Sequence, residues 1–277
     1  RRRHPEETRD ARPATWALVV GITLVIALGA RASVRVADWR DDLRLFESAV
    51  RLTPGESIAH VNYGVALADR GNPAAAEDQF REVLSLDPGN VKAHYNLGNI
   101  YRERGDLVAA EAAYRAALRV QPTHAQSHLN LGLVLVATGR TAMALDAFTR
   151  ADEVLPDHVD AKINRANALR LLDRAGEAAP FFRDALELEP RSWAARLGLA
   201  QAELETGRYD QGLERLRGLV TDHPDLVEAH LSMAIELDRR GAYELAEAAY
   251  LEVLRLDPGN RKVMLRLGLA VQDEDGG

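Results

Sequence analysis

The sequence predicts an all-α solenoid of stacked helix pairs, because one pattern of residues returns every 34 positions along its 277 residues. Prolines show the period most clearly, since seven of the 11 stand in one register: Pro54, Pro88, Pro122, Pro156, Pro190, Pro224 and Pro258. Proline lacks an amide donor and restrains the residue before it, so each of these should end a helix. Two amphipathic stretches of helical length lie between successive prolines and are separated by a turn.

Residue size is also fixed at particular positions of the unit, counted from Val91 as position 1. Positions 8 and 20 are small, which would let two helices approach closely, and position 24 is large: Phe80, Tyr114, Phe148, Phe182, Leu216 and Tyr250. Position 15 is glycine in five units, where a left-handed backbone would close the first helix: Gly71, Gly105, Gly139, Gly207 and Gly241.

These positions resemble those of the tetratricopeptide repeat (TPR) family. The resemblance implies a right-handed superhelical solenoid of helix-turn-helix repeats, in which the first helix of each repeat lines the concave face. The period gives six complete repeats, at 57–90, 91–124, 125–158, 159–192, 193–226 and 227–260.

The two ends of the chain depart from complete repeats. Residues 31–56 are expected to form a connector and a lone second helix of a half-repeat, since Phe46 and Pro54 fall in register. Residues 261–277 should add a C-terminal capping helix, which a solenoid needs, and a polar tail. Residues 1–13 are predicted to be a polar loop or tail. The chain starts at Arg1, so a fragment or a processed product is expected.

Residues 14–30 contain no charged side chain, and 17 such residues are at the short end of what crosses a bilayer. Flanking Arg12 and Arg31, together with Trp16, favour a transmembrane helix over a signal peptide or a buried core helix. The expected localisation is therefore a membrane, through a single span. Five arginines precede the span and four follow it closely, which leans towards a cytoplasmic N-terminus and extracytoplasmic repeats.

The composition of the chain excludes several classes of function. A net charge of −7 argues against a nucleic-acid partner, and the absence of cysteine excludes a disulfide framework or a cysteine-based metal site. The bias to arginine and alanine suggests a bacterial source. We find no nucleotide-binding loop, serine-hydrolase motif or zinc-protease motif. The sequence therefore predicts no catalytic residue, no cofactor and no metal, and this part of the chain is expected not to be an enzyme.

Four histidines recur at position 4 and could suggest a metal site: His60, His94, His128 and His230. Successive helix pairs stack too far apart for these side chains to share one ion, so we interpret them as structural.

Asparagine occupies position 6 in four successive repeats, and two further asparagines lie beside it at position 9: Asn62, Asn96, Asn130 and Asn164, with Asn99 and Asn167. An amide can donate to and accept from a peptide main chain. A ladder of this kind resembles the TPR arm of O-GlcNAc transferase, which implies a groove for an extended peptide. The alternative is that asparagine is merely tolerated there, as in many TPR sequences. The clamp of chaperone-binding TPR proteins is not expected, because position 5 is not lysine in any repeat.

Two repeats depart from the pattern. The repeat at 159–192 has Asp173 in place of glycine, and Gly176 and Pro180 near the start of its second helix. The repeat at 193–226 has Glu203 at the usually apolar position 11 and two extra glycines, Gly212 and Gly218. We expect the array to be least regular here.

The order of an apolar span, Trp39-Arg40-Asp41, a lone second helix and repeats beginning around His60 and His94 resembles the C-terminal part of the transmembrane-and-TPR O-mannosyltransferases. Two hypotheses follow. The first is a membrane-tethered TPR scaffold that binds a protein or extended peptide in its concave groove. The alternative is the substrate-presenting TPR domain of such a glycosyltransferase, with its catalytic part upstream.

Overall fold

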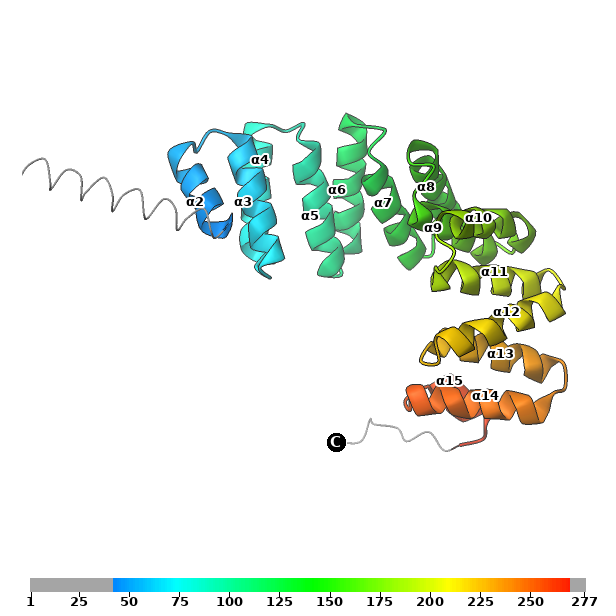
Figure 1. Cartoon of the computed structure of the whole chain (residues 1–277). Helices are drawn as coiled ribbons and strands as arrows, with labels where there is room; N and C mark the ends of the chain where they lie inside the picture. Colours follow the sequence, from blue (N-terminus) through cyan, green and yellow to red (C-terminus); the bar gives the residue numbers. More distant parts are fainter. Residues whose placement is uncertain (1–41, 270–277) are drawn as a thin grey trace, which may run out of the picture. The chain divides into compact units, whose positions relative to one another are not determined.

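The computed structural model describes residues 42–269, and this part of the chain folds into α-helices joined by short turns. The chain divides within one helix into two compact units, Arg1–Ile100 and Tyr101–Gly277. Within each unit the helices run alternately in opposite directions (Figure 1). The helices of the first unit are α2 (Asp42–Leu52), α3 (Ser57–Asp69), α4 (Pro73–Leu86) and the greater part of α5 (Val91–Glu103).

In the first unit, α3 contacts both α2 and α4. Gly64 allows α4 to come close, since a Cβ at this glycine would lie 2.8 Å from the ring of Phe80, which is only 1% exposed. The start of α4 is set by its sequence. The side chain of Asn72 accepts a hydrogen bond from the amide of Ala75 at 3.3 Å, and Pro73 stands in the first turn, where no intrahelical donor is needed.

The second unit continues with ten helices after the end of α5. They are α6 (Leu107–Val120), α7 (Ala125–Ala137), α8 (Thr141–Val154), α9 (Val159–Leu171), α10 (Ala175–Leu188), α11 (Trp193–Glu205), α12 (Tyr209–Asp222), α13 (Val227–Arg239), α14 (Tyr243–Leu256) and α15 (Arg261–Arg266). Each contacts the next from α6 to α15, and the first helices α7, α9, α11 and α13 also contact one another in series.

The core of the second unit follows the predicted large and small positions. Four residues at position 24 are at most 1% exposed: Tyr114, Phe148, Phe182 and Leu216. A Cβ at Gly132 would lie 2.4 Å from the Phe148 ring, so the small residue at position 8 is required by the approach of the two helices. The predicted all-α solenoid of helix pairs is therefore confirmed within each unit.

The predicted left-handed turns are also present. The glycines at position 15 have φ between 74° and 83°: Gly71, Gly105, Gly139, Gly207 and Gly241. Asp173 occupies the equivalent place and adopts the same conformation, with φ of 58°, as the one positive-φ residue other than glycine in the described part of the chain. A β-carbon is strained there, although aspartate tolerates it better than most residues.

The expected membrane localisation through a single span is contradicted. Crossing a bilayer takes about 20 apolar residues in one helix. The longest helices within residues 42–269 have 14 residues, and none of the described helices is long and apolar enough to cross a membrane. Residues 14–30, for which the span was predicted, lie outside the described residues, as do the polar segment 1–13, the connector 31–41 and the tail 270–277.

The two unusual repeats keep regular helices, contrary to our expectation. α10 is unbroken although Pro180 is its sixth residue. The proline removes the hydrogen bond to the carbonyl of Gly176, an exposed residue of the first turn. Gly212 fits its site: a Cβ there would lie 2.7 Å from the side chain of Leu204. Glu203 is buried, and it forms an ion pair with Arg215 at 3.0 Å.

Candidate functional site

Two of the predicted groove residues line one depression in the first unit. Asn62 projects from α3 and is exposed, while Asn96 projects from α5 and is half-buried. Both border a cavity of about 280 Å³, together with the apolar side chains of Val61 and Val65 from α3 and Phe46 from α2. The cavity therefore places two primary amides beside an apolar surface.

The lone helix α2 contributes the side chain of Phe46 to this site. None of its residues is fully buried. Phe46 is half-buried, whereas Phe80, at the same position of a complete repeat, is 1% exposed. Charges of both signs complete the border, from Asp69 on α3 and Lys92 on α5. The site can therefore offer hydrogen bonds to a main chain, apolar contact to a side chain, and charge pairing at its edge.

The remaining predicted groove residues are also half-buried. In the first unit this applies to Asn99, and in the second unit to Asn130 on α7 and to Asn164 and Asn167 on α9. Asn99 and Asn130 each already take part in an interaction within the protein. Their amides would have to exchange that interaction for one with a ligand.

Position 6 does not face a groove in every repeat. Gly198, which follows the four asparagines in register, is buried against α10, and a Cβ there would lie 2.2 Å from the ring of Phe182. The ladder therefore has no equivalent on α11. The sequence reasoning assumed one environment for position 6 throughout the array, and the glycine was the signal that α11 differs.

A charged cluster that the sequence analysis missed spans α9, α11 and α13. Arg170 donates to both carboxylate oxygens of Glu205, at 3.0 and 2.6 Å, and to the Gln201 side chain at 2.6 Å. Gln201 in turn donates to Ser232 at 2.9 Å. The four residues stand at positions 6, 9, 12 and 13, so their helical spacing alone could have placed them on one face. The bidentate pair fixes the distance between α9 and α11.

The histidines at position 4 bind the turn before their own helix. In each case Nε2 lies 2.8–3.1 Å from the carbonyl oxygen of the proline six residues earlier: His60, His94, His128 and His230. A carbonyl oxygen only accepts, so Nε2 carries the proton in all four. This confirms their structural role. They tie each first helix to the end of the preceding one.

Where position 4 is not histidine, ion pairs take over. Lys162 and Arg165 both pair with the buried carboxylate of Asp152, at 3.0 and 2.9 Å.

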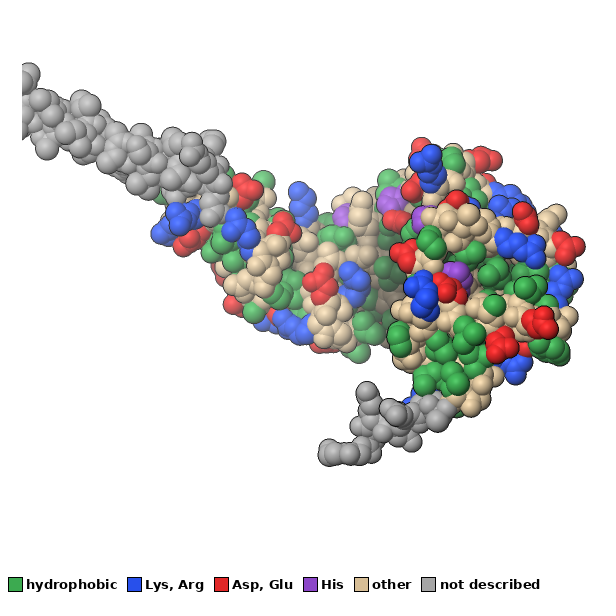
Figure 2. Space-filling model, turned by 60° about the horizontal axis from the view of Figure 1, so that its bottom comes forward, with side chains coloured by type: hydrophobic (Ala, Val, Ile, Leu, Met, Phe, Trp, Pro, Cys, Tyr) green, Lys and Arg blue, Asp and Glu red, His purple; other side chains and the backbone are tan. Residues whose placement is uncertain are grey.

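Hydrogen bonds from Arg140 and Arg115 keep the pKa of Glu111 below its ordinary value. Within residues 42–269, no group of three or more histidine, aspartate or glutamate side chains could hold a metal ion. Figure 2 shows acidic and basic side chains interspersed on the face in view.

Known protein structures share this fold. The TPR protein YrrB superposes with a TM-score of 0.55 at 19% identity, over 68% of this chain and 97% of that one. PilF of Pseudomonas aeruginosa superposes with a TM-score of 0.63 at 19% identity, over 76% of this chain and 96% of its own. At these identities the likeness shows the fold alone.

Among curated proteins, part of the chain is similar to protein O-mannosyl-transferase TMTC4. The mouse protein is 38% identical over 74 residues, which are 27% of this chain and 10% of that protein. The human protein is 40% identical over 60 residues, 22% of this chain and 8% of that protein. The chain thus matches about a tenth of the length of these relatives.

Family models give a wider match. One model of the tetratricopeptide repeat matches residues 28–91, 66–125, 95–153 and 129–192, and a second matches 169–234. The first alone covers more than half of the sequence, and its repeated matches follow the helix pairs described above. The chain therefore belongs to the tetratricopeptide repeat family.

Proposed function

We propose that the chain is a scaffold that binds a protein segment or extended peptide on the face formed by its first helices. The observation that carries the proposal is that Asn62 and Asn96, one repeat apart, line the same depression. In the second unit, Asn130, Asn164 and Asn167 are proposed to make the same kind of contact from α7 and α9.

The chemistry of the depression supports a main-chain ligand. Each amide can donate to a peptide carbonyl and accept from a peptide N–H. Val61, Val65 and Phe46 provide apolar surface for a side chain between these contacts. One protein with this fold, YrrB, is described as a TPR protein with an unusual peptide-binding site. Amide contacts to a main chain would give little preference for peptide sequence, which the apolar surface would then supply.

The test uses a peptide selected from a displayed random library on the immobilised full chain. Changing Asn62 and Asn96 together to alanine removes two hydrogen bonds, each of about 0.5–1.5 kcal/mol. The affinity should fall about tenfold to a hundredfold, because about 1.4 kcal/mol is a factor of ten.

The matched control is Gln211→Ala, which removes an exposed amide from the second helix α12. Its affinity for the peptide should equal that of the wild type. Thermal unfolding of both variants should stay close to the wild type, since Asn62 and Gln211 are exposed and Asn96 is half-buried. Unchanged affinity in the double variant would mean that asparagine is only tolerated at these positions.

A second candidate is that these repeats present protein substrates to an O-mannosyl-transferase. The 38% identity to mouse TMTC4 over 74 residues is the observation in its favour. Deletion of the complete reading frame, followed by glycopeptide mass spectrometry, tests it directly. Loss of O-linked mannose from defined proteins, restored by the intact gene, would support a transferase. An unchanged glycopeptide profile would exclude the transferase, and the binding scaffold would stand as the proposed function.

A further inference from the structure

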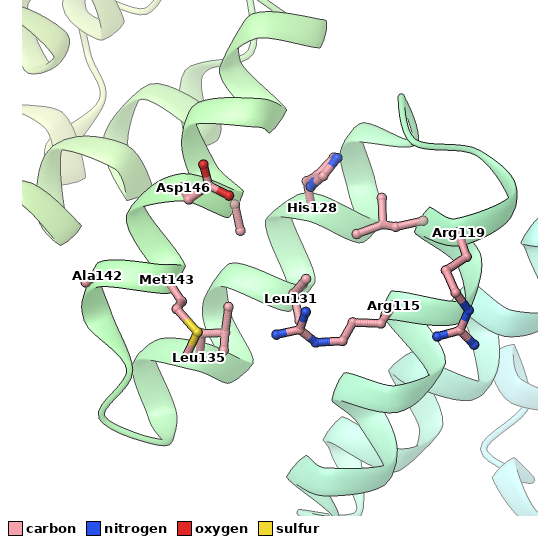
Figure 3. A pocket seen from close by; sticks show the side chains of 10 residues that line it. Arg115, Arg119, His128, Leu131, Leu135, Ala142, Met143 and Asp146 are labelled. Carbon is pink, nitrogen blue, oxygen red and sulfur yellow. The ribbon is translucent and has the colours of Figure 1, made fainter.

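A larger depression lies in the second unit, away from the asparagines. It measures about 800 Å³ and lies between α6 and α8, with α7 beneath it (Figure 3). Its walls are the second helices α6 and α8, its floor is the first helix α7, and none of the predicted asparagines lines it. Leu131 of α7 and Met143 of α8 provide apolar lining, and Met143 is 45% exposed. Arg115 and Arg119 extend from α6, and Asp146 stands on α8 (Figure 3).

The same position one repeat later is closed, and the repeat register shows why. Leu131 is at position 7, where the next repeat has Arg165, and Ala147 is at position 23, where the next repeat has Phe181. The guanidinium of Arg165 lies over the Phe181 ring, 4.0 Å from its centroid, and also pairs with Asp152 at 2.9 Å. Two large side chains thus fill the gap between α8 and α10.

The next level differs again. Arg215, at position 23 of α12, lies over α11, where it donates to the buried carboxylate of Glu203 at 3.0 and 3.1 Å. The depression over α7 is therefore not a general property of the array at these three levels. At the level of α7 the small Ala147 occupies position 23, and neither an arginine nor an aromatic side chain stands there to fill the depression.

The charge of the depression differs from that of the chain. Its lining holds two arginines against one aspartate, whereas the whole chain carries −7. Arg115 donates to Glu111 at 3.0 Å, but Glu111 also pairs with Arg140, so one carboxylate is shared by two guanidinium groups. Arg119 adds a further positive charge on the same wall. The surface is locally basic and complements an acidic ligand.

We propose that this groove docks a short acidic amphipathic helix of a partner protein. Its apolar side chains would lie on Leu118 and Met143, which are half-buried and exposed, and its carboxylates would face Arg115 and Arg119. A helix in an apolar groove between helices is a common mode of peptide recognition. The proposal uses none of the asparagines of the first proposed site, so the two stand or fall separately.

The probe is a fluorescein-labelled helical peptide of about 12 residues, ~18 Å long, with leucine on one face and glutamate on the other. It is titrated by fluorescence anisotropy against the full chain. The wild type should bind it at least about tenfold more tightly than the same peptide with lysine in place of glutamate, and added salt should weaken binding. Arg119→Glu should weaken binding at least about tenfold.

Two further variants separate the groove from general surface charge. Ala147→Phe copies the residue that closes the next gap, and should abolish binding while the helix content stays the same. Arg183→Glu makes the same charge change on an exposed site of α10, and should leave binding unchanged. The proposal is overturned if the acidic peptide does not bind the wild type, or if Ala147→Phe binds it normally. It is likewise overturned if Ala147→Phe only dissolves a self-associated form, since the occupant is then a second copy of the chain.

Discussion

Removing the guanidinium of Arg215 should destabilise the second unit, because the Glu203 carboxylate would stay buried without its partner. The side chain of Glu203 is only 4% exposed, and that of Arg215 is 35% exposed. Breaking a buried ion pair from one side costs about 3–5 kcal/mol. Since Arg215 is about one-third exposed and partly hydrated, we expect Arg215→Ala to cost about 3 kcal/mol, the lower end of that range.

The opposite change should behave differently. Four other repeats have leucine at the position of Glu203: Leu67, Leu135, Leu169 and Leu237. Glu203→Leu leaves behind a guanidinium that can reach solvent, and it adds apolar contact in the core. Replacing buried ion pairs by apolar residues is often neutral or stabilising by 1–4 kcal/mol as a general order of magnitude. We therefore expect Glu203→Leu to be neutral or more stable than the wild type by about 1 kcal/mol.

The measurement is native-state hydrogen exchange of the amides in α11 and α12, supported by urea unfolding followed by circular dichroism. Exchange reports local opening, which suits a repeat array that need not unfold in one step. Arg217→Ala is the matched control. It removes an exposed arginine from the same helix, 3.6 Å from Glu214, and should cost less than about 0.5 kcal/mol. Equal protection in Arg215→Ala and Arg217→Ala would refute the reasoning.

Three further predictions concern the turns, the irregular repeat and the end of the array. Asp173→Gly removes the backbone strain of a non-glycine residue at φ of 58°. It should raise the free energy of unfolding by about 1 kcal/mol, seen as a higher midpoint of urea unfolding. Amides at 173–183 should exchange before those at 105–118, because Pro180 removes one hydrogen bond from α10, and equal protection would refute this effect of the proline. Arg266 donates to Asp238 at 2.6 Å, and this hydrogen bond lowers the pKa of the Asp238 carboxyl below its ordinary 3.8. The stability that this pair gives the folded state is therefore present above pH 3.8 and is lost as the pH falls through the lowered pKa. α15 should therefore fray first in acid, as a pH series of amide spectra would show.

Much of the fold could be predicted because the 34-residue period determines where the helices end and which positions are large or small. A large residue at position 24 needs a small one at position 8, and Phe148 with Gly132 shows this requirement directly. A left-handed turn needs glycine or a tolerant residue, which Asp173 supplies. The expected irregularity was wrong because Pro180 and Glu203 were judged one at a time. Their surroundings compensate. Pro180 lies close to the start of its helix, where the residue that loses its hydrogen bond, Gly176, is exposed, and Glu203 has the partner Arg215.

The site was predictable only where a residue keeps one environment in every repeat. The histidines at position 4 do so, because each bonds a proline carbonyl that is also in register. Position 6 does not, since Asn62 is exposed and Gly198 is buried under Phe182. The pairing of Arg170 with Glu205 crosses 35 residues, one more than the period, so a comparison of equivalent positions does not reveal it.

The residues outside the consensus therefore decide what each level of the array can bind. The consensus positions bury their side chains between helices and leave the gaps between second helices to positions 7 and 23. With Leu131 and Ala147 the gap is open, and with Arg165 and Phe181 it is filled. The side chains at positions 7 and 23 together thus set how far each gap is filled. Since every helix pair keeps its own contacts, such changes can accumulate independently along the chain.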